Sequence, residues 1–293
     1  MAAIIIKGEE AARKIRDEAA RRAEVLKQKG IMPCLAVILP GDNPASVSYV
    51  KGKKKALAEA GMECRVIHLP AETPEKDLLS EVEKLNSDRT IHGILVQHPF
   101  PPHINEERVF TAVIPEKDVD GFHPVSSGNL MLGRPGFVPG TPLGIIYLLK
   151  EFNIPVAGKH VVIINRSNIV GKPLAILLVR KSQNATVTIC HTGTQDLGYF
   201  TRQADILIAA VGRPGLVTRD MVKEGAAVID VGVNRIPDSS KKNGFRLVGD
   251  ADFDGLLDKA GWITAVPGGV GPMSIAMVMR NLADAAAKTH SDV

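Results

Sequence analysis

One segment of the sequence predicts a buried strand, a turn and an apolar helix in direct succession: Gly158-Lys-His-Val-Val-Ile-Ile-Asn-Arg-Ser-Asn-Ile-Val-Gly-Lys-Pro-Leu-Ala-Ile-Leu-Leu-Val179. The run of Val and Ile is typical of a central strand in a parallel sheet. A strand, a turn and a helix in this order form the usual setting for a dinucleotide at a helix N-terminus. The Gly-x-Gly-x-x-Gly pattern of such turns is absent, with only Gly171 matching it. An α/β lobe that binds no nucleotide therefore remains an alternative.

The next expected strand, Thr186–Cys190, indicates which dinucleotide would bind. It is followed by His191 and Thr192, without the acidic residue that commonly holds a ribose 2′-hydroxyl. Arg166 and Ser167, directly after the first strand, are placed to meet a 2′-phosphate. The pattern therefore favours NADP over NAD.

The remainder of the chain alternates strands with helices. The further expected strands are 34–39, 63–68, 92–97, 205–214 and 227–234. The expected helices outside the opening segment are 8–30, 44–60, 73–86, 141–153 and 273–288. This alternation predicts parallel sheets with ligands bound beyond the carboxyl ends of the strands. The strands at 205–214 and 227–234 end in small residues that would let a cofactor approach, although tight turns explain these residues equally. The polar stretch 236–246 predicts an exposed loop.

Residues 44–60 predict a helix that carries one lysine on its inward side. Asn43 followed by Pro44 supplies an N-cap and a proline in the first turn. At about 100° per residue, Tyr49 and Lys53 share a stripe with two alanines, which we expect to be buried. Burial would lower the pKa of the ammonium, as a group that moves protons near neutral pH requires. A lysine that extends past the alanines to water explains the pattern equally well.

Two more polar residues stand where expected strands or turns end. Gln97 closes the strand 92–97, and its carboxamide could hold an amine such as that of Lys53. Capping of a turn is an equal alternative there. Asp120, which precedes Gly121, could accept paired hydrogen bonds from a heterocycle with adjacent N–H groups, although an Asx-turn is the commoner explanation of Asp-Gly.

Composition bounds the class of protein. The 293 residues are 45% hydrophobic, which allows an α/β protein of two domains. The net charge of +4 is spread along the chain and does not indicate nucleic-acid binding. No apolar stretch approaches the ~20 residues needed to span a bilayer, so no membrane partner is expected. The three isolated cysteines suggest neither disulfides nor a metal site, and a reducing, cytoplasmic location fits them. The short apolar start does not match a signal peptide.

Five motifs occur in the order and spacing of the bifunctional methylenetetrahydrofolate dehydrogenase/methenyltetrahydrofolate cyclohydrolases, a family that the chain resembles over essentially its whole length. They are Tyr49-x-x-x-Lys53, Gln97-x-Pro99, Lys117-Asp-Val-Asp120-Gly, Pro139-x-Thr141-Pro142-x-Gly144 and Pro267-Gly-Gly-Val-Gly-Pro272-Met-Ser. The resemblance implies two α/β lobes and a homodimer. Residues 1–145 would form a folate-binding catalytic domain to which a C-terminal helix, 272–290, returns. Residues 146–271 would form a Rossmann-like NADP-binding domain.

The resemblance implies two reactions on one tetrahydrofolate derivative. NADP-dependent oxidation of 5,10-methylenetetrahydrofolate gives the methenyl form, and hydrolysis of that form gives 10-formyltetrahydrofolate. By the same resemblance, the catalytic group is Lys53 as the proton-transfer residue, Gln97 as the residue that orients and tunes it, and Tyr49, which stacks on the folate. Asp120 would anchor the pterin. The other implied substrate-binding residues are Pro267, Gly268 and Gly269. The implied cofactor-binding residues are Asn165, Arg166, Ser167, Gly171, His191, Thr192, Gly212 and Val233.

Several positions depart from the usual family pattern. They are His98 and Phe100 in what is commonly Gln-Leu-Pro-Leu, Gly140 for cysteine or alanine, Asn165 for glycine, and Ser274 for threonine. A monofunctional or NAD-preferring dehydrogenase is the nearest alternative. More distant alternatives are an amino-acid or shikimate-type dehydrogenase and a non-catalytic nucleotide-sensing protein.

Overall fold

The computed structural model describes residues 2–241 and 244–289, and the chain divides into two compact units. The six-stranded unit comprises Met1–Ala12 and Thr141–Ser274, and the three-stranded unit comprises Arg13–Gly140 and Ile275–Val293. None of the helices in the described residues combines the length and the apolar character that crossing a membrane requires.

The six-stranded unit is built on a parallel sheet, as the alternation of strands and helices predicts. Its strands are β1 (Ile4–Ile6), β5 (His160–Ile164), β6 (Thr186–Cys190), β7 (Ile206–Ala209), β8 (Ala227–Asp230) and β11 (Trp262–Thr264). Their order is β1-β11-β8-β7-β5-β6, and every pairing is parallel. From β5 the chain reaches β6 on one side, and β7 then pairs with β5 on the other. The carboxyl end of β5 is therefore the topological switch point, where ligands of such sheets bind.

Short helices connect these strands. They are α6 (Gly140–Glu151), α7 (Gly171–Val179), α8 (Leu197–Thr201), α9 (Phe253–Leu256) and the 3-10 helix η2 (Arg219–Met221). The expectation of a plain loop over 236–246 is wrong in part, because β9 (Asn234–Pro237) and β10 (Phe245–Val248) form an antiparallel pair. Their side chains are half-buried or exposed, so polar residues suit a strand there. Residues 242 and 243 of that stretch lie outside the described part.

The chain's first residues form a strand that the sequence did not predict. The boundaries suggested by the sequence place residues 1–145 together, whereas β1 pairs with β11 through Ile4 opposite Trp262 and Ile6 opposite Thr264. Hydrogen bonds across more than 250 residues of chain therefore join β1 to the six-stranded unit, a link that local sequence does not reveal.

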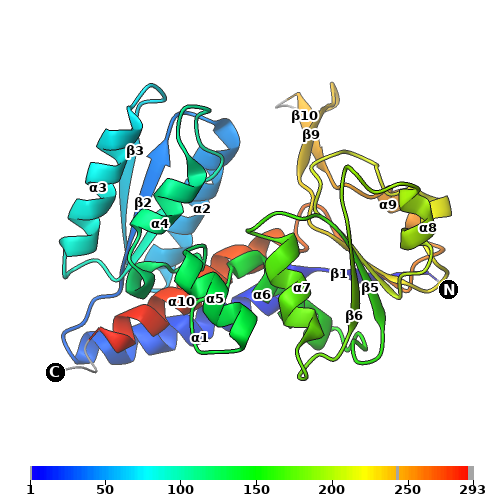
Figure 1. The fold of residues 1–293 in the computed structure, drawn as a ribbon, viewed down its shortest axis with the longest axis horizontal. Coiled ribbons are helices and arrows are strands. Elements are labelled where there is room, and N and C mark those ends of the chain that lie inside the picture. The colour runs from blue at the N-terminus through cyan, green and yellow to red at the C-terminus, as the bar shows by residue number, and fades with distance from the viewer. Residues whose placement is uncertain (1, 242–243, 290–293) are drawn as a thin grey trace. The chain divides into compact units, whose positions relative to one another are not determined.

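The three-stranded unit contains a second parallel sheet, of order β3-β2-β4. Its strands are β2 (Cys34–Pro40), β3 (Glu63–Leu69) and β4 (Gly93–Val96). Its helices are most of α1 (Gly8–Gln28), α2 (Pro44–Glu59), α3 (Glu75–Ser87), α4 (Glu106–Ala112), α5 (Pro124–Leu132), most of α10 (Gly271–Lys288) and the 3-10 helix η1 (Pro115–Lys117). Figure 1 shows α3 and α2 on opposite sides of this sheet.

Alternate residues of β2 enter two different cores. Ala36 and Ile38 pack with side chains of α3 and α4. Leu35 and Val37 pack with α1, α2 and α10. This alternation is expected of a strand buried on both faces. It fixes the position of α2 against the sheet.

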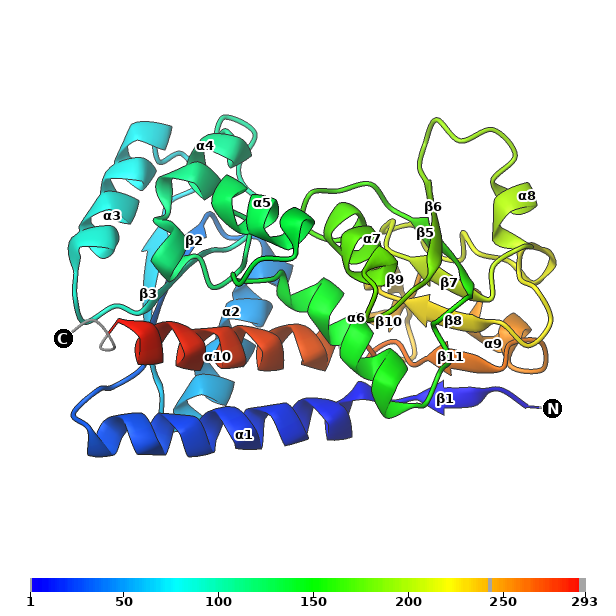
Figure 2. The same ribbon diagram turned by 60° about the horizontal axis from the view of Figure 1, so that its bottom comes forward.

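The C-terminal helix α10 packs in the three-stranded unit, as expected. It runs beside α1 in both ribbon views (Figures 1 and 2), and Arg22 of α1 pairs with Asp284 of α10. Met279 and Leu282 of α10 enter the core that contains Leu35. Residue 290, the last residue of the predicted helix, lies outside the described residues.

Candidate functional site

Helix α2 begins as the sequence predicts, and the two alanines of the expected stripe, Ala56 and Ala60, are buried, but Tyr49 is not. The Asn43 side chain accepts hydrogen bonds from the backbone N–H groups of residues 45 and 46, at 2.9 and 3.3 Å. Val50 and Leu57 are buried, whereas Tyr49 is 39% exposed, so the expected burial of Tyr49 is wrong. The large branched side chains occupy the core, which leaves Tyr49 accessible to a flat ligand. Lys53 lies between these faces and is half-buried.

Lys53 is held by Gln97, as the sequence suggests. Lys53 Nζ donates to Gln97 Oε1 at 2.9 Å, and Gln97 Nε2 donates to the backbone oxygen of His98 at 2.7 Å. The Gln97 backbone N–H donates to Ile38 O at 2.8 Å, which continues the pairing of β4 with β2. Both ends of the Gln97 amide are therefore used, and its oxygen faces the amine.

Lys53 and Asp120 influence each other's charge. Burial lowers the pKa of Lys53, and the Asp120 carboxylate opposes this shift. Burial raises the pKa of Asp120 to about 6, while Lys53 acts to lower it and Asp118 to raise it. Groups whose charged forms are disfavoured in this way can exchange protons near neutral pH. The amine of Lys53 and the carboxyl group of Asp120 are thus close enough for the charge of each to affect the pKa of the other.

Asp118, which the sequence did not single out as functional, shapes the turn around Asp120. Its carboxylate accepts hydrogen bonds from the N–H groups of Phe122 (3.1 Å) and His123 (2.9 Å) and from Ser126 Oγ (2.6 Å). Burial raises the pKa of Asp118 to about 6, and these hydrogen bonds act in the opposite direction. The only local signal was an acidic residue two positions before Asp120.

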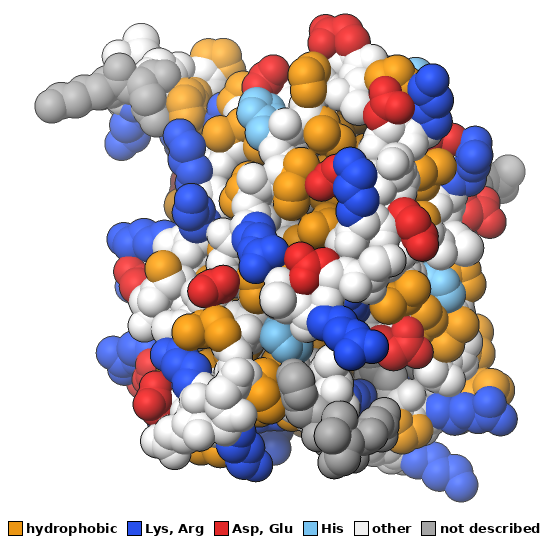
Figure 3. All heavy atoms as spheres, turned by 90° about the vertical axis from the view of Figure 1, so that its left-hand side faces the viewer, with side chains coloured by type: hydrophobic (Ala, Val, Ile, Leu, Met, Phe, Trp, Pro, Cys, Tyr) orange, Lys and Arg blue, Asp and Glu red, His pale blue; other side chains and the backbone are white. Residues whose placement is uncertain are grey.

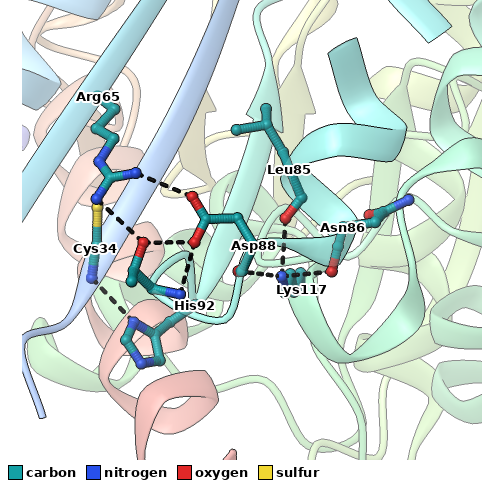
Figure 4. A network of polar contacts seen from close by, with 8 residues as sticks. Cys34, Arg65, Leu85, Asn86, Asp88, His92 and Lys117 are labelled. Atoms are coloured by element: carbon teal, nitrogen blue, oxygen red, sulfur yellow. Dashed lines mark hydrogen bonds and ion pairs between the residues drawn. The ribbon is translucent and has the colours of Figure 1, made fainter. Parts of the chain in front are cut away.

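Lys117 acts as a structural ammonium for the same turn (Figure 4). It is 9% exposed, and its Nζ donates to the backbone oxygens of Leu85 (2.8 Å), Asn86 (2.7 Å) and Asp88 (2.8 Å) at the end of α3. A cation is favourable there because a helix C-terminus leaves carbonyl groups without intrahelical partners. Lys117 therefore joins the Asp118–Asp120 turn to α3.

His98, an unusual residue beside Gln97, directs its ring away from Lys53. Its Nε2 lies 2.7 Å from Glu106 Oε1, and the ring packs edge-on against Phe100 with centroids 5.7 Å apart. The contact of His98 with the Lys53 site is its backbone oxygen, which accepts from Gln97. The other unusual residue, Phe100, continues this packing onto Phe110.

In the six-stranded unit, Asn165 organises the turn after β5. Its Oδ1 accepts from Ser167 N (2.8 Å), Ser167 Oγ (2.7 Å) and Gly171 N (3.0 Å), and its Nδ2 donates to Ala210 O (2.5 Å). A Cβ on Gly171 would lie 2.1 Å from the Asn165 backbone oxygen, so glycine is required there. Arg166 is exposed, whereas the Ser167 hydroxyl donates its hydrogen to Asn165.

The other predicted cofactor residues follow the carboxyl ends of neighbouring strands. His191 and Thr192 follow β6, Gly212 follows β7 and Val233 follows β8, so the sheet order brings them to one edge. Thr192, Gly212 and Val233 are exposed. Exposed Arg166 and the Thr192 hydroxyl at this edge suit an anionic dinucleotide, with no acidic residue at the end of β6 to repel a phosphate.

The predicted substrate residues at 267–269 form a closely packed turn. Gly8 N donates to Gly268 O at 2.8 Å, and Gly268 has a φ of 101°, which favours glycine. A Cβ on Gly269 would lie 2.5 Å from Ala265 O. Backbone conformation at Gly268 and packing at Gly269 therefore require these glycines, whatever the turn binds. Ser274, one of the departures, keeps a hydroxyl that lies 2.8 Å from Thr141 Oγ1.

No group of three or more His, Cys, Asp or Glu side chains within the described residues is arranged to hold a metal ion. The cysteines Cys34, Cys64 and Cys190 are free thiols.

Two family models match the chain. The model described as tetrahydrofolate dehydrogenase/cyclohydrolase, catalytic domain, matches residues 6–120. The model described as tetrahydrofolate dehydrogenase/cyclohydrolase, NAD(P)-binding domain, matches residues 139–290.

Known relatives match over nearly the whole length. The bifunctional protein FolD of Exiguobacterium sibiricum is 54% identical over 288 residues, covering 97% of this chain and 99% of the relative. The crystal structure of the FolD methylenetetrahydrofolate dehydrogenase/cyclohydrolase of Campylobacter jejuni is 47% identical with a TM-score of 0.91, covering 98% and 99%. The Trypanosoma brucei FolD, solved with NADP cofactor and inhibitor, is 38% identical with a TM-score of 0.94, covering 99% of each chain.

Proposed function

We propose that this chain, which belongs to the tetrahydrofolate dehydrogenase/cyclohydrolase family, is a bifunctional enzyme of one-carbon folate chemistry. It oxidises 5,10-methylenetetrahydrofolate with NADP and hydrolyses the resulting 5,10-methenyltetrahydrofolate to 10-formyltetrahydrofolate. The observation that carries this proposal is the 2.9 Å hydrogen bond between Lys53 and Gln97, beside a carboxyl group of raised pKa. A dehydrogenase alone has no need of a proton-transfer amine at its folate site.

Hydrolysis is the step that uses Lys53. Water adds to the electrophilic methenyl carbon, and ring opening then requires a proton at the departing nitrogen. Burial favours the neutral amine of Lys53, which can accept a proton from the water and return it to that nitrogen, while the remaining hydroxyl proton is released to solvent as the formyl C=O bond forms. Gln97 fixes the direction of the amine, and the exposed ring of Tyr49 is available to stack on the folate.

Oxidation requires the folate and the cofactor to be held in register. When bound, NADP supplies the acceptor for a hydride from the methylene carbon. Arg166 would hold the 2′-phosphate, with Thr192 as a further donor, at the carboxyl edge of the six-stranded sheet. Asp120 would anchor the pterin by accepting from its adjacent N–H groups. No acid or base is needed for this step, so orientation is the contribution of these residues.

The experiment measures the two reactions separately on the purified protein. NADP or NAD reduction is followed with 5,10-methylenetetrahydrofolate, and loss of added methenyl substrate is followed without cofactor. We expect reduction with NADP and hydrolysis of the methenyl form. Reduction without hydrolysis would instead support a monofunctional dehydrogenase, and faster reduction with NAD would support an NAD-preferring enzyme. Cofactor binding with neither reaction would support a nucleotide sensor.

Lys53→Met tests the role of the amine. We expect hydrolysis to fall by about 10²- to 10⁴-fold, the usual contribution of a general acid–base group, while folate binding persists. Lys51→Met on the same helix is the matched control, since Lys51 is exposed, and it should hydrolyse at the parent rate. A Lys53→Met protein that hydrolyses the methenyl form as fast as the parent would refute the assignment.

The partners proposed are the folate substrate and a second copy of the chain. A homodimer follows from the resemblance and is supported by β3, an edge strand whose side chains are all exposed or half-buried. Sedimentation at several concentrations would test it. No nucleic-acid or membrane partner is proposed, because the charge of +4 is small and acidic and basic groups are interspersed on the face in Figure 3. A cytoplasmic location remains the prediction made from the unpaired cysteines.

A further inference from the structure

A buried aspartate binds the segment that follows β7. Asp250 is 0% exposed, and it lies two residues after β10. Its Oδ2 accepts hydrogen bonds from the N–H groups of Val211 (2.5 Å) and Gly212 (3.0 Å), and its Oδ1 accepts from that of Arg213 (2.9 Å). Three consecutive peptide N–H groups therefore converge on one carboxylate.

The same carboxylate also reaches the segment after β8. Asp250 Oδ1 accepts from Asn234 Nδ2 at 2.9 Å, and Asn234 directly follows the exposed Val233. Gly212 and Val233 are both predicted cofactor residues, and both stand at the carboxyl edge of the six-stranded sheet. Asp250 thus connects two segments that would contact one ligand.

A second buried aspartate holds Asp250 in place. Asp230 Oδ1 accepts from the N–H groups of Asp250 (2.9 Å) and Gly232 (3.0 Å), and its Oδ2 accepts from Ala251 N (2.8 Å). A Cβ on Gly232 would lie 2.3 Å from Asp250 Cγ, and a Cβ on Gly249 would lie 1.8 Å from Asp230 Oδ2. Both glycines are therefore needed for the carboxylates to pack as they do.

We propose that Asp250 is a positioning residue for the dinucleotide cofactor, which it serves by fixing Val211–Arg213 and, through Asn234, the Val233 segment. This inference rests on the proposed NADP-dependent function. The N–H groups of Val211–Arg213 are bound by the protein and are not available to a phosphate. The segment therefore suits a part of the cofactor that donates hydrogen bonds, such as a carboxamide, in contact with the bare Cα of Gly212.

Asp250→Asn changes one oxygen to an NH₂ group. Asn234 can turn its amide to accept from that group, but one backbone N–H of the segment then faces a donor and loses its acceptor. We expect the dissociation constant for NADP, measured by calorimetry, to rise about tenfold, as loss of one hydrogen bond to a charged group would produce. Hydrogen exchange at residues 211–213, measured without cofactor, should become faster. Cofactor-free hydrolysis of the methenyl substrate should stay within about twofold of the parent rate, because Lys53 belongs to the other compact unit.

The matched control is Asp252→Asn, since exposed Asp252 accepts a hydrogen bond from Gly255 and, among the hydrogen bonds described, makes none to either segment. It should leave the NADP dissociation constant unchanged. If Asp250→Asn does not fold, Asn234→Ala provides the test. It removes only one of the four hydrogen-bond donors to Asp250, and we expect the dissociation constant for NADP to rise about threefold. An unchanged NADP affinity in a folded Asp250→Asn protein, or equal losses of NADP affinity and hydrolysis, would overturn the positioning role. Absence of NADP binding in the unaltered protein would instead overturn the proposed function.

Discussion

The free energy of unfolding should depend strongly on Lys117, whose ammonium satisfies three backbone carbonyl groups at the end of α3. Lys117→Met keeps a long apolar side chain but removes all three hydrogen bonds. The Asp88 carbonyl keeps its hydrogen bond from Ile91 N (3.1 Å), so two carbonyls would lose their partner. A buried polar group left without a partner costs about 1–3 kcal/mol, which sets an upper bound of about 6 kcal/mol. The substitution also removes the free-energy cost of burying the ammonium, which offsets several kcal/mol of this loss. Burial lowers the pKa of Lys117, which is consistent with such a desolvation cost.

The net loss expected for Lys117→Met is about 2 kcal/mol, because the relieved burial of the ammonium offsets part of the cost of the two carbonyls left without a partner. Urea unfolding followed by circular dichroism measures it. Lys84→Met is the matched control, since Lys84 is an exposed lysine of α3 that pairs only with Glu81 among the contacts described, and it should cost less than about 0.5 kcal/mol. A change below about 1 kcal/mol for Lys117→Met would show that these three hydrogen bonds contribute little, against the reasoning from burial.

Two further predictions concern the chemistry of the two units. Gln97→Glu places a carboxylate where an amide oxygen lies 2.9 Å from Lys53 Nζ, which favours the ammonium and raises the pKa of Lys53. For each unit of increase, hydrolysis at a pH below that pKa should fall about tenfold and recover as the pH rises, so a pH–rate profile that does not move would contradict the role of the neutral amine. Arg166→Ala should raise the NADP dissociation constant about tenfold, and Ser167→Ala less than about threefold, because the Ser167 hydroxyl already donates to Asn165. Equal effects of the two substitutions, measured by calorimetry, would show that the hydroxyl turns toward the cofactor.

The sequence predicted those parts of the fold that depend on neighbouring residues. The apolar runs gave β2, β5 and β6, and Asn43 with Pro44 gave the start of α2. The link between Lys53 and Gln97 was also found, because each residue lies at a recognisable position of a helix or strand. Contacts between distant segments were not found. β1 was missed because its partner β11 lies at the other end of the chain.

The missed polar residues have a common physical reason. Asp118 and Asp250 each precede or follow glycine-rich turns, where aspartate usually caps a turn in contact with water. Their burial, and the number of N–H groups they accept, are properties of the folded chain and leave no periodic pattern in the sequence. Tyr49 shows the converse error: helical spacing placed it inward, but the adjacent Val50 is buried and Tyr49 is exposed, although Ala56 and Ala60 of the same stripe are buried as expected. Periodicity identifies a helix more reliably than it identifies which of two adjacent faces is buried.

In both units a buried charged side chain fixes a turn beside a candidate site. The sign of its charge determines which backbone groups of the turn, carbonyl or N–H, remain free to bind a ligand. In the three-stranded unit, the Lys117 ammonium donates to backbone carbonyl oxygens, and the adjacent Asp118 accepts from backbone N–H groups. In the six-stranded unit, Asp250 accepts hydrogen bonds from three backbone N–H groups. Each of these charges has hydrogen-bond partners within the protein, mostly backbone groups, and is therefore not available to the ligand. Asp120 and Arg166 are not satisfied in this way among the hydrogen bonds described, which leaves them as the charged groups for the pterin and the phosphate. Neutralising a turn-holding charge should thus disturb geometry and affinity together, whereas neutralising Asp120 or Arg166 should lower affinity with the turns intact.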